Sequence, residues 1–87
     1  MKLTISPRAE KELKKIPKIY QIVIAKKIRS LLEAKILNEE KLSGFKDIFR
    51  VRVGEYRIVY RKTRQEVYII LIRHRKDVYR LVNQLLK

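Results

Sequence analysis

Cysteine is absent from this sequence of 87 residues, and histidine occurs once, as His74. The absence of cysteine excludes disulfide bonds, thiolate zinc sites and a cysteine nucleophile. A single histidine excludes a multi-histidine metal site, and no cluster of carboxylates suggests a magnesium-dependent nuclease. We therefore expect a protein that needs neither a metal nor a small-molecule cofactor.

Long hydrophobic runs are also missing. The longest is Val67 to Ile72, far short of the ~18 residues that cross a membrane. The stretch Met1 to Pro7 has no signal-peptide pattern, so we expect a cytoplasmic protein. With only two glycines and two prolines, connections should be short, and residues 1–87 should form a single domain.

Acidic residues are scarce: nine Asp and Glu stand against 23 Lys and Arg, for a net charge of +14. Hydrophobic residues make up 46%, which is too many for a disordered basic tail. A folded chain this basic indicates a polyanionic partner, either nucleic acid or an acidic protein. A membrane surface fits worst, because the apolar residues are needed for the core.

The first half of the chain predicts a short strand and two helices. Lys2 to Ile5 alternates polar and apolar residues, as a strand does. Ser6-Pro7 is a typical helix start, and the first helix should run from about Pro7 to Ile16. Pro17 separates it from a second helix at about Lys18 to Lys35, on which Ile24, Ile28, Leu31 and Leu32 form an apolar stripe. Most lysines of this hairpin should form a solvated face.

After a polar connection from Asn38 to Lys46, the apolar period changes to two. Ile48–Val53 and Tyr56–Arg61 should form a hairpin around Gly54-Glu55, with glycine first as in a type II′ turn. Val67–Ile72 fits a central strand covered on both faces, and Val78 to Leu86 a final helix. The fold class is α+β, with the order β-α-α-β-β-β-α. We expect a mostly antiparallel four-stranded sheet, the helical hairpin on one face and the last helix at an edge.

One face of the predicted hairpin carries an unusual set of arginines. The turn places Arg52 opposite Arg57, and like charges in that position destabilise a strand pair. Arg50 and Arg61 share this face. His74 and Arg75 follow the central strand and should overhang the same face, with Tyr79 one helical turn further on. Arginines, a histidine and a tyrosine suit metal-free RNA cleavage, in which the 2′-hydroxyl attacks the adjacent phosphate.

These residues resemble the RelE/ParE superfamily of type II toxins. The resemblance rests on Lys41-Leu42-Ser43-Gly44, on the segment Phe49 to Tyr60 with its R-x-G-x-Y-R-x-x-Y core, and on the ending His74-Arg75-Lys76-Asp77-Val78-Tyr79. It covers nearly the whole chain. The RelE branch implies a ribosome-dependent ribonuclease that cuts mRNA in the A site and is held inactive by a RelB-like antitoxin.

The resemblance also implies site residues. By position, the catalytic set is Arg50, Arg52, Arg57, Arg75 and Tyr79, to which our reasoning adds His74. Further candidates for contacts with RNA are Arg61, Arg73 and Lys46. The family often has lysine where this sequence has Arg50 and Arg52, and arginine is a poor proton acceptor. Because of that departure, His74 is the better candidate for the general base; the nearest acidic residues, Asp47 and Glu55, are not convincing in that role. Two alternatives stay open: a ParE-like gyrase poison, and a non-catalytic module that binds RNA or the ribosome.

Overall fold

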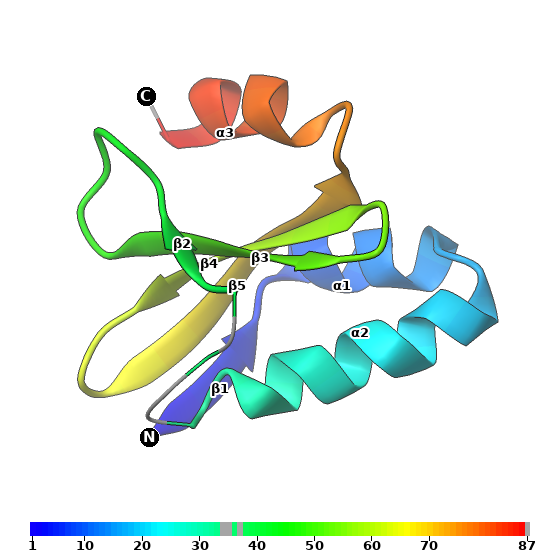
Figure 1. The fold of residues 1–87 in the computed structure, drawn as a ribbon, viewed down its shortest axis with the longest axis horizontal. Coiled ribbons are helices and arrows are strands. Elements are labelled where there is room, and N and C mark those ends of the chain that lie inside the picture. Colours follow the sequence, from blue (N-terminus) through cyan, green and yellow to red (C-terminus); the bar gives the residue numbers. More distant parts are fainter. Residues whose placement is uncertain (34–35, 37, 87) are drawn as a thin grey trace.

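The protein, described by a computed structural model over residues 1–33, 36 and 38–86, has three helices and five strands among these residues (Figure 1). In chain order they are β1 (Lys2–Ile5), α1 (Pro7–Lys15), α2 (Lys18–Ser30), β2 (Glu40–Lys41), β3 (Ile48–Val53), β4 (Tyr56–Lys62), β5 (Glu66–His74) and α3 (Val78–Leu86). The predicted α+β class is confirmed.

All five strands form one sheet in the order β1-β5-β4-β3-β2. β1 runs parallel to β5, and the other neighbours are antiparallel. The predicted register of the β3–β4 hairpin is confirmed, with Arg52 opposite Arg57, and Gly54 takes a φ of 57° that suits glycine in the turn. The prediction of four strands was wrong, because two residues of the expected connection pair with β3 as β2.

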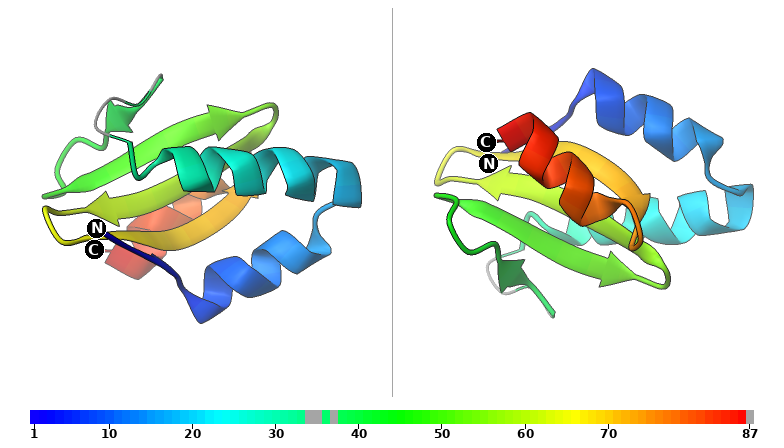
Figure 2. Two further views of the ribbon diagram at one scale, coloured as in Figure 1. Left: turned by 90° about the horizontal axis from the view of Figure 1, so that it is seen from below. Right: turned by 90° about the horizontal axis from the view of Figure 1, so that it is seen from above.

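The helices α1 and α2 cover one face of the sheet and form the main core with it (Figures 1 and 2). Ser6 caps α1 as expected, since its Oγ accepts a hydrogen bond of 3.0 Å from the Ala9 amide. The second helix ends at Ser30, five residues before the predicted end at Lys35, which lies outside the described residues. Leu32, expected on the apolar stripe, is 37% exposed, because it follows the end of the helix.

The helix α3 covers the opposite face of the sheet rather than an edge, so that part of the prediction was wrong (Figure 2). Its apolar side packs on three residues that point away from the helical hairpin: Ile48, Val59 and Leu71. Each belongs to a different strand. The sheet is therefore the middle of three layers, and β5 is covered on both sides as its apolar sequence predicts. Among the described residues, no helix combines the length and apolarity needed to cross a membrane.

Candidate functional site

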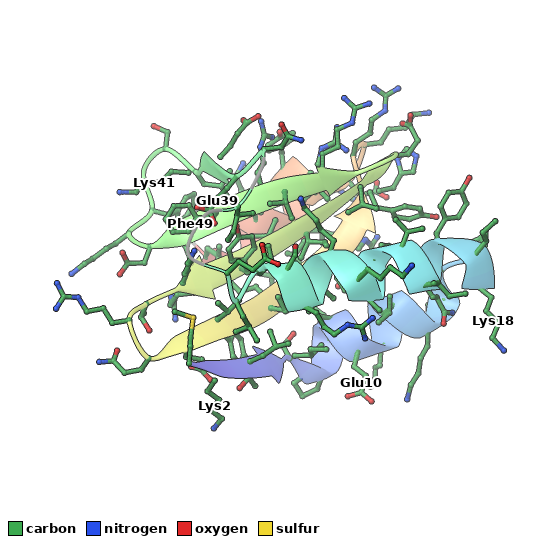
Figure 3. All side chains as sticks on the ribbon, turned by 60° about the horizontal axis from the view of Figure 1, so that its bottom comes forward. Lys2, Glu10, Lys18, Glu39, Lys41 and Phe49 are labelled. Carbon is green, nitrogen blue, oxygen red and sulfur yellow. The ribbon has the colours of Figure 1, made fainter. Side chains whose placement is uncertain are left out.

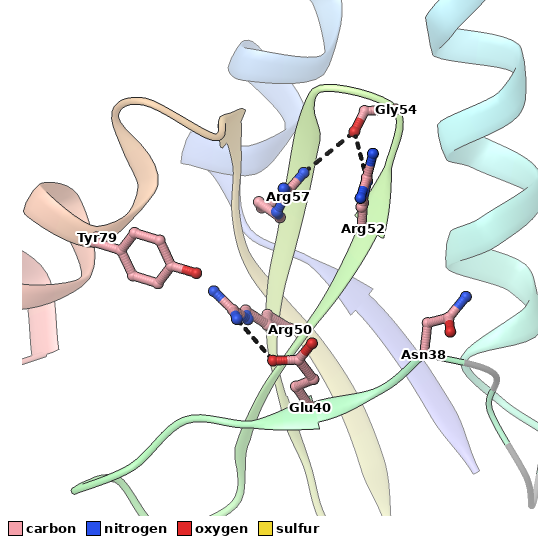
Figure 4. Close-up of a pocket in the computed structure, with 7 residues that line it drawn as sticks. All are labelled: Asn38, Glu40, Arg50, Arg52, Gly54, Arg57 and Tyr79. Carbon is pink, nitrogen blue, oxygen red and sulfur yellow. Dashed lines mark hydrogen bonds and ion pairs between the residues drawn. The ribbon is translucent and has the colours of Figure 1, made fainter.

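A hollow of about 500 Å³ lies on the α3 side of the sheet, beside the β3–β4 turn (Figure 4). We call it the arginine pocket. Its walls come from the hairpin, from the segment that precedes it and from α3, and its lining residues are Asn38, Glu40, Arg50, Arg52, Gly54, Arg57 and Tyr79. Four of these were expected on the arginine face, and the structure places all four around one space.

Arg50 is the centre of the pocket. Its Nη2 lies 2.7 Å from Glu40 Oε2, and its guanidinium carbon lies 5.0 Å from the centre of the Tyr79 ring. A guanidinium at that distance over an aromatic face is held by a cation–π interaction. Because Arg50 is bound from two sides, its charge points into the pocket in a fixed place (Figure 4).

Arg52 and Arg57 converge on the turn. Arg52 Nε and Arg57 Nη1 each donate to the carbonyl oxygen of Gly54 at 3.2 Å. Partial burial lowers the pKa of Arg57, and the charges of Arg52 and Arg50 lower it further. No carboxylate among the described residues is bonded to either guanidinium, so an anion that enters the pocket would relieve their mutual repulsion.

Glu40 is the one carboxylate that lines the pocket within the described part of the chain. Its hydrogen bond to Arg50 lowers its pKa, so the side chain is ionised at neutral pH. It serves as a counterion to Arg50 and is a weak proton acceptor. Sequence reasoning missed Glu40, because it treated residues 38–46 as a polar connection. A strand pairing of two residues leaves no periodic signal that could have revealed it.

The neighbouring Glu39 anchors this segment to the other face of the sheet (Figure 3). The buried Tyr60 hydroxyl donates to Glu39 Oε2, and Lys62 Nζ lies 3.9 Å from the same oxygen. Burial and the Glu39 carboxylate raise the pKa of Tyr60 far above its usual range. Consecutive residues of an extended chain point to opposite faces. Because Glu39 is held on the side of the sheet that α1 and α2 cover, Glu40 is held on the α3 side, where the arginine pocket lies.

His74 does not reach the arginine pocket, contrary to our expectation. It pairs across the sheet with Tyr56, and directly paired residues share a face. Tyr56 belongs to the face that α1 and α2 cover. The His74 ring meets the Tyr56 ring edge-on at 6.0 Å, and both line a separate hollow next to α1. Among the described residues of the pocket, histidine is thus not available as a proton acceptor.

The comparison with known proteins identifies the family. The family model for the ParE toxin of type II toxin–antitoxin systems matches residues 3–79. The chain belongs to this toxin family. A RelE-like toxin protein of Escherichia coli is 30% identical over 82 residues, which cover 87% of this chain and 86% of that protein.

Solved structures of RelE toxins share the fold of this toxin. The RelB–RelE antitoxin–toxin complex from Methanococcus jannaschii matches with a TM-score of 0.75 and 25% identity, covering 90% of this chain and 96% of that one. A mutant of E. coli RelE in the free state matches with a TM-score of 0.75 and 26% identity, covering 98% and 97%. The toxin is thus RelE-like in fold as well as in sequence.

The remaining predicted site residues of the toxin lie outside the pocket. Arg75 Nε pairs with Glu55 at 2.6 Å on the exposed turn, near enough for its charge to act on Arg57. Arg73 bends to Glu12 and Asp77, at 3.3 and 3.7 Å. The two others lie further away: Arg61 is exposed on β4, and Lys46 lines a hollow near the β4–β5 turn. The structure therefore groups three arginines with Tyr79 and separates the rest.

Proposed function

We propose that this toxin is an endoribonuclease that cleaves mRNA in the ribosomal A site. The observation that carries the proposal is the arginine pocket, where, among the described residues, three guanidinium groups and a tyrosine surround a space with one carboxylate. Arginine binds phosphate with two parallel hydrogen bonds, and a half-exposed aromatic ring can hold an unpaired base. Tyr79 is 48% exposed, so a base can stack beside Arg50.

The reaction that suits these groups is an internal transesterification. The 2′-oxygen of the ribose forms a bond to the adjacent phosphorus, and the bond from phosphorus to the 5′-oxygen breaks. The products are a 2′,3′-cyclic phosphate and a free 5′-hydroxyl. Arg50, Arg52 and Arg57 would stabilise the extra negative charge of the transition state, so the step needs no metal.

Two side chains of the pocket could exchange protons during this step, Glu40 and Tyr79. The 2′-hydroxyl must lose a proton and the 5′-oxygen must gain one. Arginine keeps its proton at neutral pH, and His74 lies on the other face of the sheet. The charge of the arginines should therefore contribute more to the rate than general base catalysis does.

The partners that we propose are the translating ribosome in the cytoplasm and an acidic antitoxin. A net charge of +14 favours long-range attraction to a particle rich in phosphate. Several structural relatives are complexes of RelE with RelB, and an acidic segment laid on the arginine pocket would block phosphate binding. The exposed guanidinium groups are suited to such carboxylates.

The proposal is tested by expressing the toxin without an antitoxin and mapping new 5′ ends in translated mRNA. We expect cuts within A-site codons, reduced at least 100-fold in Arg50→Ala. The matched control is Arg64→Ala, at an exposed arginine in the β4–β5 turn outside the pocket, which should cut normally. New ends that carry a 5′-phosphate instead of a 5′-hydroxyl would contradict the transesterification step.

The same experiment separates the alternatives. The family model is that of ParE toxins, and a gyrase poison would arrest growth with intact mRNA and trapped gyrase–DNA complexes. A binding module would sediment with ribosomes and leave mRNA uncut. Either result would overturn the ribonuclease proposal.

A further inference from the structure

Another hollow lies on the other side of the β3–β4 turn, between the hairpin and α2. Its volume is about 510 Å³, and we call it the α2 groove. One wall is a stripe of α2 and the other is the end of the hairpin. The lining residues are Val23, Lys26, Lys27, Ser30, Arg52, Val53 and Gly54, and none of them is acidic.

The α2 groove adjoins the arginine pocket directly. Arg52 and Gly54 line both hollows. The strand β2 pairs only with Phe49 and Arg50 of β3, so from Val51 to Val53 no described strand lies beyond β3. Figure 4 shows α2 beyond Arg52, across this open edge. A chain that leaves the arginine pocket at Arg52 can thus pass over the edge of the sheet and meet α2.

We propose that the α2 groove is a second RNA subsite, which binds phosphodiester groups through Lys26, Lys27 and Arg52. The apolar Val23, which is 49% exposed in the groove, would contact a base or sugar beside these cations. Sites for single-stranded nucleic acid combine such a positive groove with apolar contacts and have little sequence preference. The inference rests on the proposed function, because RNA reaches the groove through the arginine pocket.

A protein partner is the competing occupant, since Ile19, Ile22 and Val23 of α2 are 70%, 57% and 49% exposed. Two observations favour RNA in the groove itself. Only Val23 of these three residues lines it, and the groove shares its arginine with a pocket suited to phosphate. The RNA could be the mRNA that is cut or a neighbouring segment of ribosomal RNA, which offers the same phosphodiester chemistry.

The first experiment measures binding of a 12-nucleotide 2′-O-methyl RNA, which cannot undergo the cleavage step, at several salt concentrations. Each phosphate contact with single-stranded RNA contributes about 0.7 to the slope of log K against log salt. Lys26→Ala/Lys27→Ala should lower the slope by about 1.4 and weaken binding about 25-fold at 0.1 M salt. A trinucleotide of the same chemistry, too short to leave the arginine pocket, should bind the variant and the unaltered toxin equally.

The matched control removes two exposed lysines elsewhere on the helical hairpin, Lys14 and Lys18 (Figure 3 labels Lys18). Lys14→Ala/Lys18→Ala has the same net charge as the test variant, and neither lysine lines the groove. We expect the slope of log K against log salt to fall at most half as much in the control as in the test variant. Equal loss in both variants, or loss with the trinucleotide, would overturn the subsite.

The second experiment distinguishes the two sources of RNA. The sequence has no cysteine, so Ser30→Cys places one attachment point for a photocrosslinker in the groove. On ribosomes programmed with mRNA, crosslinks to mRNA or to ribosomal RNA would support the subsite and identify its source. Crosslinks to protein alone, or none, would overturn it. Toxin that crosslinks to RNA but never cuts would overturn the proposed ribonuclease and leave the subsite intact.

Discussion

The two faces of the β3–β4 hairpin carry different parts of the protein's task. On the face toward α1 and α2, Val51, Ile58 and Tyr60 are fully buried. On the other face, Ile48 and Val59 lie under α3, while Arg50, Arg52 and Arg57 near the turn surround a hollow. The same two strands thus hold a core on one side and an unfilled site on the other.

The difference shows where stability has been given up. An arginine opposite an arginine weakens a strand pair by a few tenths of a kcal/mol or more, and three guanidinium groups crowd one small space. Apolar residues at those positions could have extended the core under α3. A small domain has little stability in reserve, so the cost is sensible only if the arginines bind something.

The largest expected effect comes from breaking the buried face. Ile58→Ala removes a fully buried side chain and should lower the free energy of unfolding by about 2–5 kcal/mol, measured by urea denaturation. Arg61→Ala, at an exposed position of the same strand, should change it by less than about 0.5 kcal/mol. If Ile58→Ala leaves no folded protein to measure, Ile58→Val should lose about 0.5–1.5 kcal/mol. Equal losses at Ile58 and Arg61 would remove the contrast.

Breaking the arginine face should have opposite effects on rate and stability. Arg57→Ala should slow RNA cleavage about 100- to 1,000-fold, because a donor to the transition state is lost. Its free energy of unfolding should stay the same or rise by a few tenths of a kcal/mol, because the repulsion from Arg52 is relieved. Cleavage assays and urea denaturation of the same preparation test both. A slow enzyme that is also markedly less stable would mean that Arg57 is structural.

The Tyr60–Glu39 contact lies on the face toward α1 and α2, and its removal should change the pH dependence of stability. Burial and Glu39 raise the pKa of Tyr60 in the folded state, whereas an unfolded tyrosine ionises near about pH 10. The stabilisation is therefore complete below that pH and is lost above it, at up to about 1.4 kcal/mol per pH unit. Tyr60→Phe should lower the free energy of unfolding by about 1–2 kcal/mol near neutral pH, because it removes the hydrogen bond to the charged Glu39.

Urea denaturation at pH 8 and at pH 11 checks this prediction. The difference in free energy of unfolding between the unaltered toxin and Tyr60→Phe should be smaller at pH 11. Only the unaltered toxin has a phenol whose pKa is raised by folding, and it loses that stabilisation when the unfolded chain ionises. A gap of the same size at both pH values would show that the hydroxyl contributes no such linkage.

Much of the fold could be predicted because local patterns were unambiguous. Ser6-Pro7 fixed the start of α1, and Gly54 fixed a turn from which the whole β3–β4 register followed. The place of α3 could not be derived in the same way. The register puts Ile48 and Val59 on the same face as the arginines, and α3 packs on these two apolar residues, but the hairpin pattern alone does not say which element covers them.

The candidate site was predictable only for residues whose face of the sheet follows from the alternation of side chains along a strand. Arg50, Arg52 and Arg57 follow from the hairpin register, but His74 needed the pairing of β5 with β4. Val59 and Tyr60 of β4 flank an irregularity in that pairing, which shifts the register by a residue. A shift of one residue moves a side chain to the other face, and sequence alone does not locate such a bulge. Glu40 was missed for a similar reason, because β2 is too short to show a period.

The smallest expected effect sharpens the role of Glu40, which faces the arginines as their local counterion. Glu40 Oε2 lies 2.7 Å from Arg50 Nη2, and a phosphate oxygen that binds Arg50 would have to compete with this carboxylate. Glu40→Gln should therefore strengthen binding of a 2′-O-methyl RNA about 5-fold at 0.1 M salt, as one more phosphate contact would. Lys41→Gln, the next residue and outside the pocket, should not strengthen it. If Glu40→Gln instead leaves affinity unchanged and slows cleavage more than about 100-fold, Glu40 is the proton acceptor for the 2′-hydroxyl and the counterion role is wrong.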